Sequence, residues 1–225
     1  FFFFFFLQLS VKEFVMDFEA AAWKAVRQEF PNVRMRGCTF HWSQAVWRKV
    51  QQLGQQVSYQ KDPPTHTYIR KLFALPMLPA EHIIPVFNYL KDSAVTNPLA
   101  DLIEYISSQW ILSTTFPPQT WSAFFHTTRT NNDCESWHSA LNRRAGKSKL
   151  QLYLLAELLA EEAATVSVEA QYISEGTLSR YQRKKYKRMH GRLFDAWEEY
   201  MRTSTRDIEL AKMLLRKCAG IYCPF

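Results

Sequence analysis

The chain has 225 residues, of which 47% are hydrophobic and 15% aromatic, and this composition excludes a disordered protein. The formal net charge of +7 favours a polyanionic partner, because the basic residues gather in two clusters. Four cysteines without disulfide-framework spacing favour a reducing compartment, and no apolar run is long enough to span a bilayer.

Residues 1–10 begin with FFFFFFLQ, which is neither a signal peptide nor a plausible strand. Phenylalanine codons followed by Leu-Gln can be read from a pyrimidine tract that ends in CAG, as an intron does. We therefore expect residues 1–10 to be a non-native leader from intron read-through or a gene-model edge. A continuous spliced message encoding all the phenylalanines would contradict this.

Residues 11–57 read as strand, helix, strand and helix. A short buried strand runs from Val11 to Met16 and ends at Asp17, and an alanine-rich helix then continues to Pro31. Alternating residues predict a second strand over 32–40. A further helix is expected from about Trp42 to Gly54.

The rest of the chain is predicted to be helical. In residues 58–124 KDPP opens a loop, and short amphipathic helices separated by prolines follow as a helical insertion. Residues 125–165 carry Thr130 as a candidate N-cap, Glu135 in the first turns of its helix, and another helix over 150–164. Residues 166–225 form a basic helical C-terminal region.

Single residues in this pattern allow ordinary explanations. Asp17 can cap the helix that follows it, and Glu135 can complement a helix dipole. Cys38 and His41 have the spacing of half a zinc site, and the best second pair is Cys134 with His138.

Three motifs in order change the interpretation: D17-F-E-x-A, F30-P-N-x-x-x-x-G-C-x-F-H-W, and R129-T-N-N-D-C-E-S-W-H. Together, from about Val11 to Ala164, they resemble the transposases of Mutator-like elements. The resemblance implies an α/β, RNase-H-like core that is interrupted by an all-α insertion. It also implies an Asp-Asp-Glu triad that binds Mg²⁺ or Mn²⁺, with Asp17 as the second acid and Glu135 as the third; Zn²⁺ is not expected.

The resemblance also assigns supporting roles. Cys38 and His41 become a family signature, and Arg129, Asn131, Asn132 and His138 support the active site. The residues expected to bind DNA are Arg143, Arg144, Lys147, Arg183, Lys184, Lys185, Lys187 and Arg188. A solvated helix face explains a single basic cluster, but two clusters in the same third of the chain favour nucleic acid.

The first acid of the triad belongs on a strand upstream of Asp17, so we expect an N-terminally truncated fragment with about two core strands, inactive as given. The expected partners are double-stranded DNA at element termini and target, with a homo-oligomer in the transposition complex, in the nucleus and not at a membrane. The alternative is a domesticated descendant that acts as a non-catalytic nuclear DNA-binding regulator.

Overall fold

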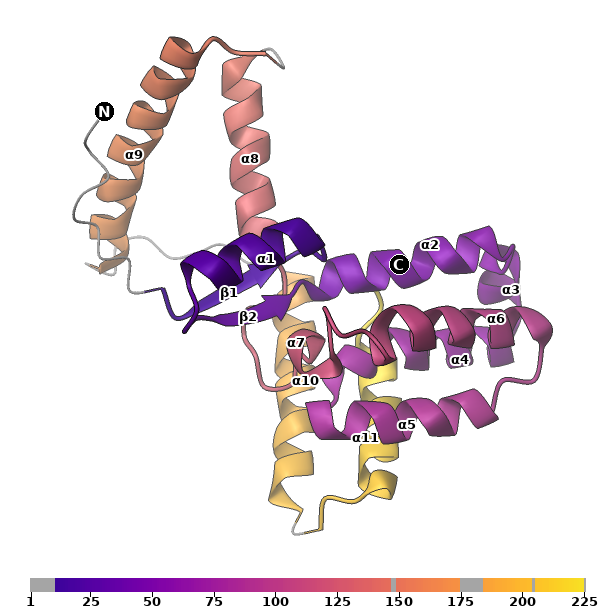
Figure 1. The fold of residues 1–225 in the computed structure, drawn as a ribbon. Coiled ribbons are helices and arrows are strands. Elements are labelled where there is room, and N and C mark those ends of the chain that lie inside the picture. The colour runs from indigo at the N-terminus through magenta and orange to yellow at the C-terminus, as the bar shows by residue number, and fades with distance from the viewer. Residues whose placement is uncertain (1–10, 147–148, 175–183, 204, 225) are drawn as a thin grey trace. The chain divides into compact units, whose positions relative to one another are not determined.

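A computed structural model describes residues 11–146, 149–174, 184–203 and 205–224. The chain divides into two compact units: the first takes in the chain up to Thr130 together with the part from Arg188 onward, and the second is Asn131–Lys187. Helices dominate, and the described residues contribute two parallel strands, so the predicted mostly helical fold with two strands is confirmed (Figure 1). None of the described helices is both long and apolar enough to cross a membrane.

A strand–helix–strand motif opens the first unit. β1 (Glu13–Met16) pairs in parallel with β2 (Arg34–Gly37), and α1 (Ala20–Glu29) connects them. Such a crossover is needed because parallel strands cannot be joined by a tight turn. The predicted order is confirmed, but β1 is half-buried rather than buried, and Trp23 is the buried residue of α1.

α2 (Thr39–Gln52) follows β2 without a loop. The predicted start near Trp42 is wrong, because the strand ends at Gly37 and the helix begins directly after Cys38. Cys38 is therefore the N-cap residue and His41 lies in the first turn of the helix.

The predicted helical insertion forms the body of the first unit. Its elements are α3 (Gln56–Lys61), α4 (Pro63–Phe73), the 3₁₀ turn η1 (Leu75–Met77), α5 (Ala80–Asp92), α6 (Asn97–Ile106), the π-helical turn η2 (Ser107–Ile111) and α7 (Pro118–Trp121). KDPP begins a helix rather than a loop. Asp62 Oδ2 accepts a hydrogen bond from the Thr65 N–H at 3.0 Å, and the prolines stand in the first turn, where their missing N–H groups cost nothing.

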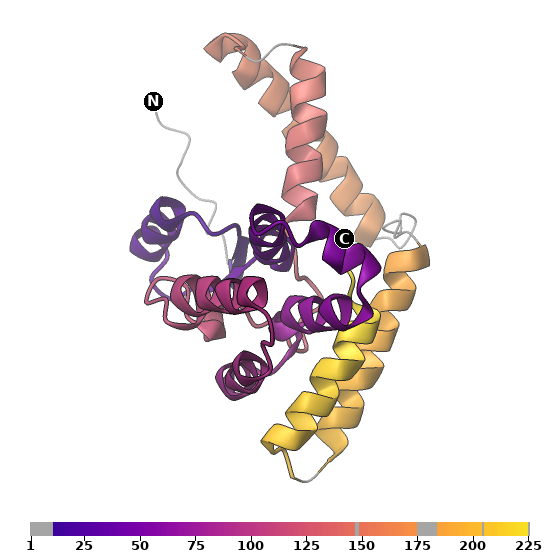
Figure 2. The ribbon, with the colours of Figure 1, turned by 90° about the vertical axis from the view of Figure 1, so that its right-hand side faces the viewer.

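The C-terminal helices complete the same core. α10 (Lys184–Arg202) and α11 (Ile208–Ile221) form an antiparallel pair, as both views show (Figures 1 and 2). Trp197 is fully buried and its Nε1 donates to the Met77 carbonyl at 2.9 Å. The chain from Arg188 onward thus belongs to the first unit and does not stand apart as a C-terminal region.

The second unit is a helical hairpin of α8 (Asn132–Ala145) and α9 (Leu152–Ser174). Gly146 ends α8 at a φ of +67°, a left-handed conformation that glycine adopts without strain. Glu135 lies in the first turn of α8 as predicted, but the N-cap residue is Asn131 rather than Thr130, and its side chain makes no capping bond. The second compact unit begins at Asn131, whereas the predicted segment begins at residue 125.

Candidate active site at the carboxyl end of the parallel strands

Asp17 follows the last residue of β1, and its backbone is held on both sides. Its carbonyl accepts a hydrogen bond from Trp23 Nε1 at 2.7 Å, and the Met16 carbonyl accepts one from the Cys38 N–H at 2.6 Å. The Asp17 side chain is exposed and makes no hydrogen bond or ion pair with any described residue. It does not cap α1, whose N-cap position is occupied by Glu19. The backbone at Asp17 is thus fixed, and its carboxylate is bound to no described residue.

Phe18 anchors the residue after Asp17 in an aromatic cluster. Its ring packs with centroid distances of 6.3, 4.6 and 5.3 Å against Trp23, Trp110 and Phe116. A Cβ on Gly37 would lie 2.2 Å from Phe18 Cζ. The glycine before Cys38 therefore makes room for the ring that positions Asp17.

Glu13 and Arg36 join the two strands by a bidentate ion pair. Arg36 Nε and Nη2 donate to the Glu13 carboxylate at 2.7 and 2.5 Å, and the Arg36 side chain is only 5% exposed. The hydrogen bond from Arg36 holds the pKa of Glu13 below its ordinary value. The carboxylate of Glu13 is thus paired with Arg36 across the two strands.

The C-x-x-H segment connects this edge of the sheet to the chain that precedes α8. Cys38 is buried and donates its N–H to Met16, while the N–H of Thr39 donates to the Arg129 carbonyl at 2.9 Å. His41 is half-buried in the first turn of α2. Residues from β1, α2 and the end of the insertion therefore meet at the carboxyl ends of the strands, where open α/β sheets usually bind ligands.

Arg129 is a buried cation at the same junction. It is 6% exposed, Nη1 donates to the His126 carbonyl at 3.3 Å, and its guanidinium carbon lies 5.7 Å from the centre of the Trp197 ring. Burial lowers the pKa of Arg129 from its ordinary value. Arg129 forms no ion pair with a described residue, so no described carboxylate offsets the free-energy cost of burying its charge.

The remaining predicted site residues belong to the second unit. Glu135 is half-buried and its N–H donates to the Asn131 carbonyl at 3.1 Å. Cys134 and His138 are exposed one helical turn apart on α8, and Asn132 is exposed at its start. Asp17, Cys38 and His41 lie in the first unit, and within the described ranges no three His, Cys, Asp or Glu side chains form a potential metal site.

The basic residues differ in how far they are engaged. Arg143 is exposed, whereas Arg144 forms ion pairs with Glu161, at 2.7 Å, and with Glu162. Lys187 and Arg188 are exposed on α10. Lys147 and Arg183 lie outside the described residues, as do the side chains of Lys184 and Lys185.

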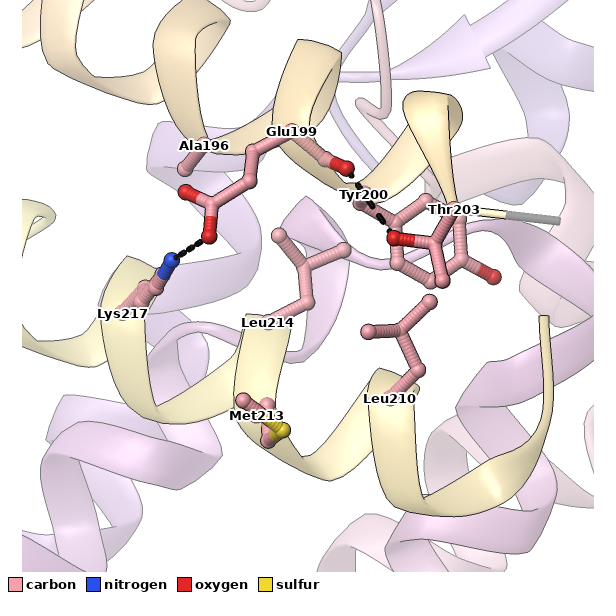
Figure 3. A pocket seen from close by; sticks show the side chains of 8 residues that line it. All are labelled: Ala196, Glu199, Tyr200, Thr203, Leu210, Met213, Leu214 and Lys217. Atoms are coloured by element: carbon pink, nitrogen blue, oxygen red, sulfur yellow. Dashed lines mark hydrogen bonds and ion pairs between the residues drawn. The ribbon is translucent and has the colours of Figure 1, made fainter. Parts of the chain in front are cut away.

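Two cavities lie away from these residues. A cavity of about 40 Å³ between α10 and α11 is lined by Ala196, Glu199, Tyr200, Thr203, Leu210, Met213, Leu214 and Lys217, with Glu199 and Lys217 paired at one side (Figure 3). It holds a few water molecules at most. A larger one, about 480 Å³, is lined by Pro63, Pro64, Thr67, Tyr68, Lys71, Tyr89, Leu90 and Ser93. Neither contains a predicted site residue.

Sequence reasoning missed two of these relationships. The contact of Phe18 with Gly37 and the burial of Arg129 depend on residues far apart in the chain, so no local pattern reveals them. Trp137 is 38% exposed and donates Nε1 to Glu162 at 3.1 Å, so it is not a core residue.

Comparison with models of protein families, with curated proteins and with solved structures finds no match for this chain.

Proposed function

We propose that this chain is part of a DNA transposase of the Mutator-like kind, in which an RNase-H-like core cuts and joins DNA strands with an Asp-Asp-Glu triad. One observation carries the proposal. Asp17 stands at the carboxyl end of a parallel strand with its backbone fixed and its exposed carboxylate bound to no described residue. A side chain kept in that state at a strand end is suited to binding a ligand rather than to stabilising the fold.

The arrangement around Asp17 supports this reading. The C-x-x-H segment bonds to β1 through Cys38 and to Arg129 through Thr39. The third motif of the resemblance begins at Arg129, so its first residue meets the second motif in space although the whole insertion separates them in sequence. The proposed role of Cys38 is to join these strands, and the proposed role of Arg129 is to place a positive charge beside the cleaved DNA.

Asp17 and Glu135 are the proposed ligands of Mg²⁺ or Mn²⁺. Their carboxylate oxygens are the hard donors that these cations prefer, and α8 carries Glu135 in its first turn. The bound ions would activate the attacking oxygen and stabilise the leaving one in phosphoryl transfer. Zinc has weaker support, because a structural zinc site takes four ligands and Cys38 with His41 supplies two.

DNA is the proposed partner and the nucleus the proposed location. Arg143, Lys187 and Arg188 are exposed and make no ion pair with a described residue. Such residues bind phosphate groups without reading bases. The alternative, a non-catalytic nuclear regulator, would keep this DNA contact without needing the carboxylates.

Metal-directed backbone cleavage tests the proposed ligands. Fe²⁺ in place of Mg²⁺ reduces added hydrogen peroxide to a hydroxide ion and a hydroxyl radical, and the radical cuts the polypeptide close to the ligands. We expect cuts near residue 17 and near residue 135, both lost in Asp17→Asn and in Glu135→Gln. Glu19→Gln is the matched control, because it removes an exposed carboxylate two positions away and should leave the cuts intact. Cuts near only one of the two residues, which persist when the other residue is substituted, would contradict a metal site shared by Asp17 and Glu135.

A further inference from the structure

The larger cavity, of about 480 Å³, lies between α4 and α5, and we call it the α4–α5 cavity. Its lining comes from α4, from α5 and from Ser93, the residue that ends α5. Pro63, Thr67 and Ser93 are exposed, so the cavity opens to solvent. Its volume is within the range of about 300–1,000 Å³ that is typical of small-molecule sites.

The buried side of the α4–α5 cavity ties the two helices together. Tyr68 and Leu90 are both buried, and the hydroxyl of Tyr68 donates to the Leu90 carbonyl at 2.6 Å. α11 packs against both α4 and α5. The distance between the two walls is therefore set by the packing of helices rather than by a loop.

Rings form much of the apolar lining. Pro63 and Pro64 occupy the first turn of α4, where they present pyrrolidine rings and no N–H donor. Tyr89 is half-buried on α5, and Lys212 Nζ lies 4.1 Å from the centre of its ring. Lys212 is also paired with Glu209 at 2.7 Å, so it holds the ring of Tyr89 without adding an unpaired charge. A tyrosine ring held in this way can pack on the ring of an aromatic ligand.

Lys71 is the charged residue among those that line the α4–α5 cavity. Its side chain is half-buried and forms no ion pair with a described residue. Asp62, before the first turn of α4, is engaged by the Thr65 N–H, and Asp92 is exposed and does not line the cavity. An ammonium group that is partly removed from water without a carboxylate partner favours an anionic ligand.

We propose that the α4–α5 cavity binds a small aromatic anion, in which a planar ring carries a carboxylate or a phosphate group. The ring packs against Tyr89 and the prolines of α4. The anionic group accepts hydrogen bonds from the ammonium of Lys71 and from the hydroxyl of Thr67, which lies one helical turn before Lys71. The lining residues lie outside the three motifs of the transposase resemblance, so the inference is independent of the proposed catalytic function.

Isothermal titration calorimetry of the full chain tests the cavity with probes that share a naphthalene ring: naphthyl phosphate, naphthoate and the uncharged naphthol. We expect saturable binding of an anionic probe, about tenfold or more tighter than that of naphthol, because only the anions can pair with Lys71. Of the two anions, the one that binds more tightly identifies the group that the site accepts.

Matched variants locate the binding. Lys71→Met should raise the dissociation constant of the anionic probe by about tenfold or more and leave that of naphthol unchanged. Lys24→Met removes the same charge from an exposed position of α1 and should leave both constants unchanged. Thr67→Trp fills the cavity from an exposed lining position and should abolish the binding of every probe. Circular dichroism equal to that of the wild type verifies that each variant keeps its helices.

Any of several results would overturn the aromatic-anion site. One is the absence of saturable binding of both anions at millimolar concentration, and another is naphthol binding as tight as that of the anions. Anion binding that survives Lys71→Met or Thr67→Trp would place the ligand elsewhere, as would equal weakening by Lys24→Met and Lys71→Met.

Discussion

Phe18 occupies the space that a side chain at position 37 would need, because a Cβ on Gly37 would lie 2.2 Å from Phe18 Cζ. The ring has little room to move, since Trp110 and Phe116 pack edge-on against it. Gly37→Ala should therefore lower the free energy of unfolding by about 1–3 kcal/mol, measured by chemical denaturation.

Gly191→Ala is the control for that substitution. Gly191 lies inside α10, and a Cβ there meets nothing within 4 Å. Alanine should raise the free energy of unfolding by about 0.5–1 kcal/mol at this position, because glycine is the poorer helix former. Equal effects at the two glycines would show that Phe18 does not restrict position 37.

The ion pair between Glu13 and Arg36 predicts a pH dependence of stability. In the folded state Arg36 lowers the pKa of Glu13 from its ordinary value of 4.5. The charged form of Glu13 is therefore more stable in the folded protein than in the unfolded chain. This contribution is fully present above pH 4.5 and is lost as the pH falls through the lowered pKa. Glu13→Gln should flatten that part of the profile of unfolding free energy against pH. Glu104→Gln, at an exposed position of α6, should leave it unchanged.

The two buried arginines should respond in opposite ways to replacement by methionine. Arg36→Met leaves Glu13 without its partner and should lower the free energy of unfolding by about 1–3 kcal/mol. Arg129→Met removes a buried charge that no described carboxylate offsets, so the free energy of unfolding should stay the same or rise. If the charge of Arg129 contributes to DNA binding, the same variant should bind DNA more weakly. A large loss of stability in Arg129→Met would instead make Arg129 a structural residue.

Neighbouring arginines on α8 should likewise differ. Arg143 is exposed without an ion pair to a described residue, whereas Arg144 holds Glu161 and Glu162. Arg143→Ala should weaken DNA binding and reduce the slope of log affinity against log salt by about 1. Arg144→Ala should reduce helicity in circular dichroism more than it changes this slope. The reverse pattern would assign the DNA contact to Arg144.

Local signals in the sequence predicted most elements of the fold but not the way they pack. The order of strands and helices up to Gln52 follows from alternation and helical periodicity, and prolines delimit the insertion. The loop predicted at KDPP is wrong, because Asp62 caps the helix that begins at Pro63. Asp and Pro are common both in loops and at the first positions of helices. The C-terminal helices join the core through long-range contacts such as Trp197 with Met77, which no short window contains.

The candidate site shows the same division. Asp17 could be found from the sequence because it ends a predicted strand, and the C-x-x-H segment could be found from the spacing of Cys38 and His41. The contact between Thr39 and Arg129 could not, since 89 residues separate them along the chain and only the folded insertion brings them together.

DNA cleavage by the protein translated from the complete gene tests the central claim most directly. Its substrate is duplex DNA that carries the element's ends, with Mg²⁺ or Mn²⁺ present. The account predicts metal-dependent strand cleavage that falls to background in Asp17→Asn and in Glu135→Gln, while Glu19→Gln and Asp133→Asn keep wild-type cleavage. Full cleavage in Asp17→Asn or in Glu135→Gln would contradict the role of that carboxylate, and DNA binding without any cleavage by the wild type would favour the non-catalytic regulator.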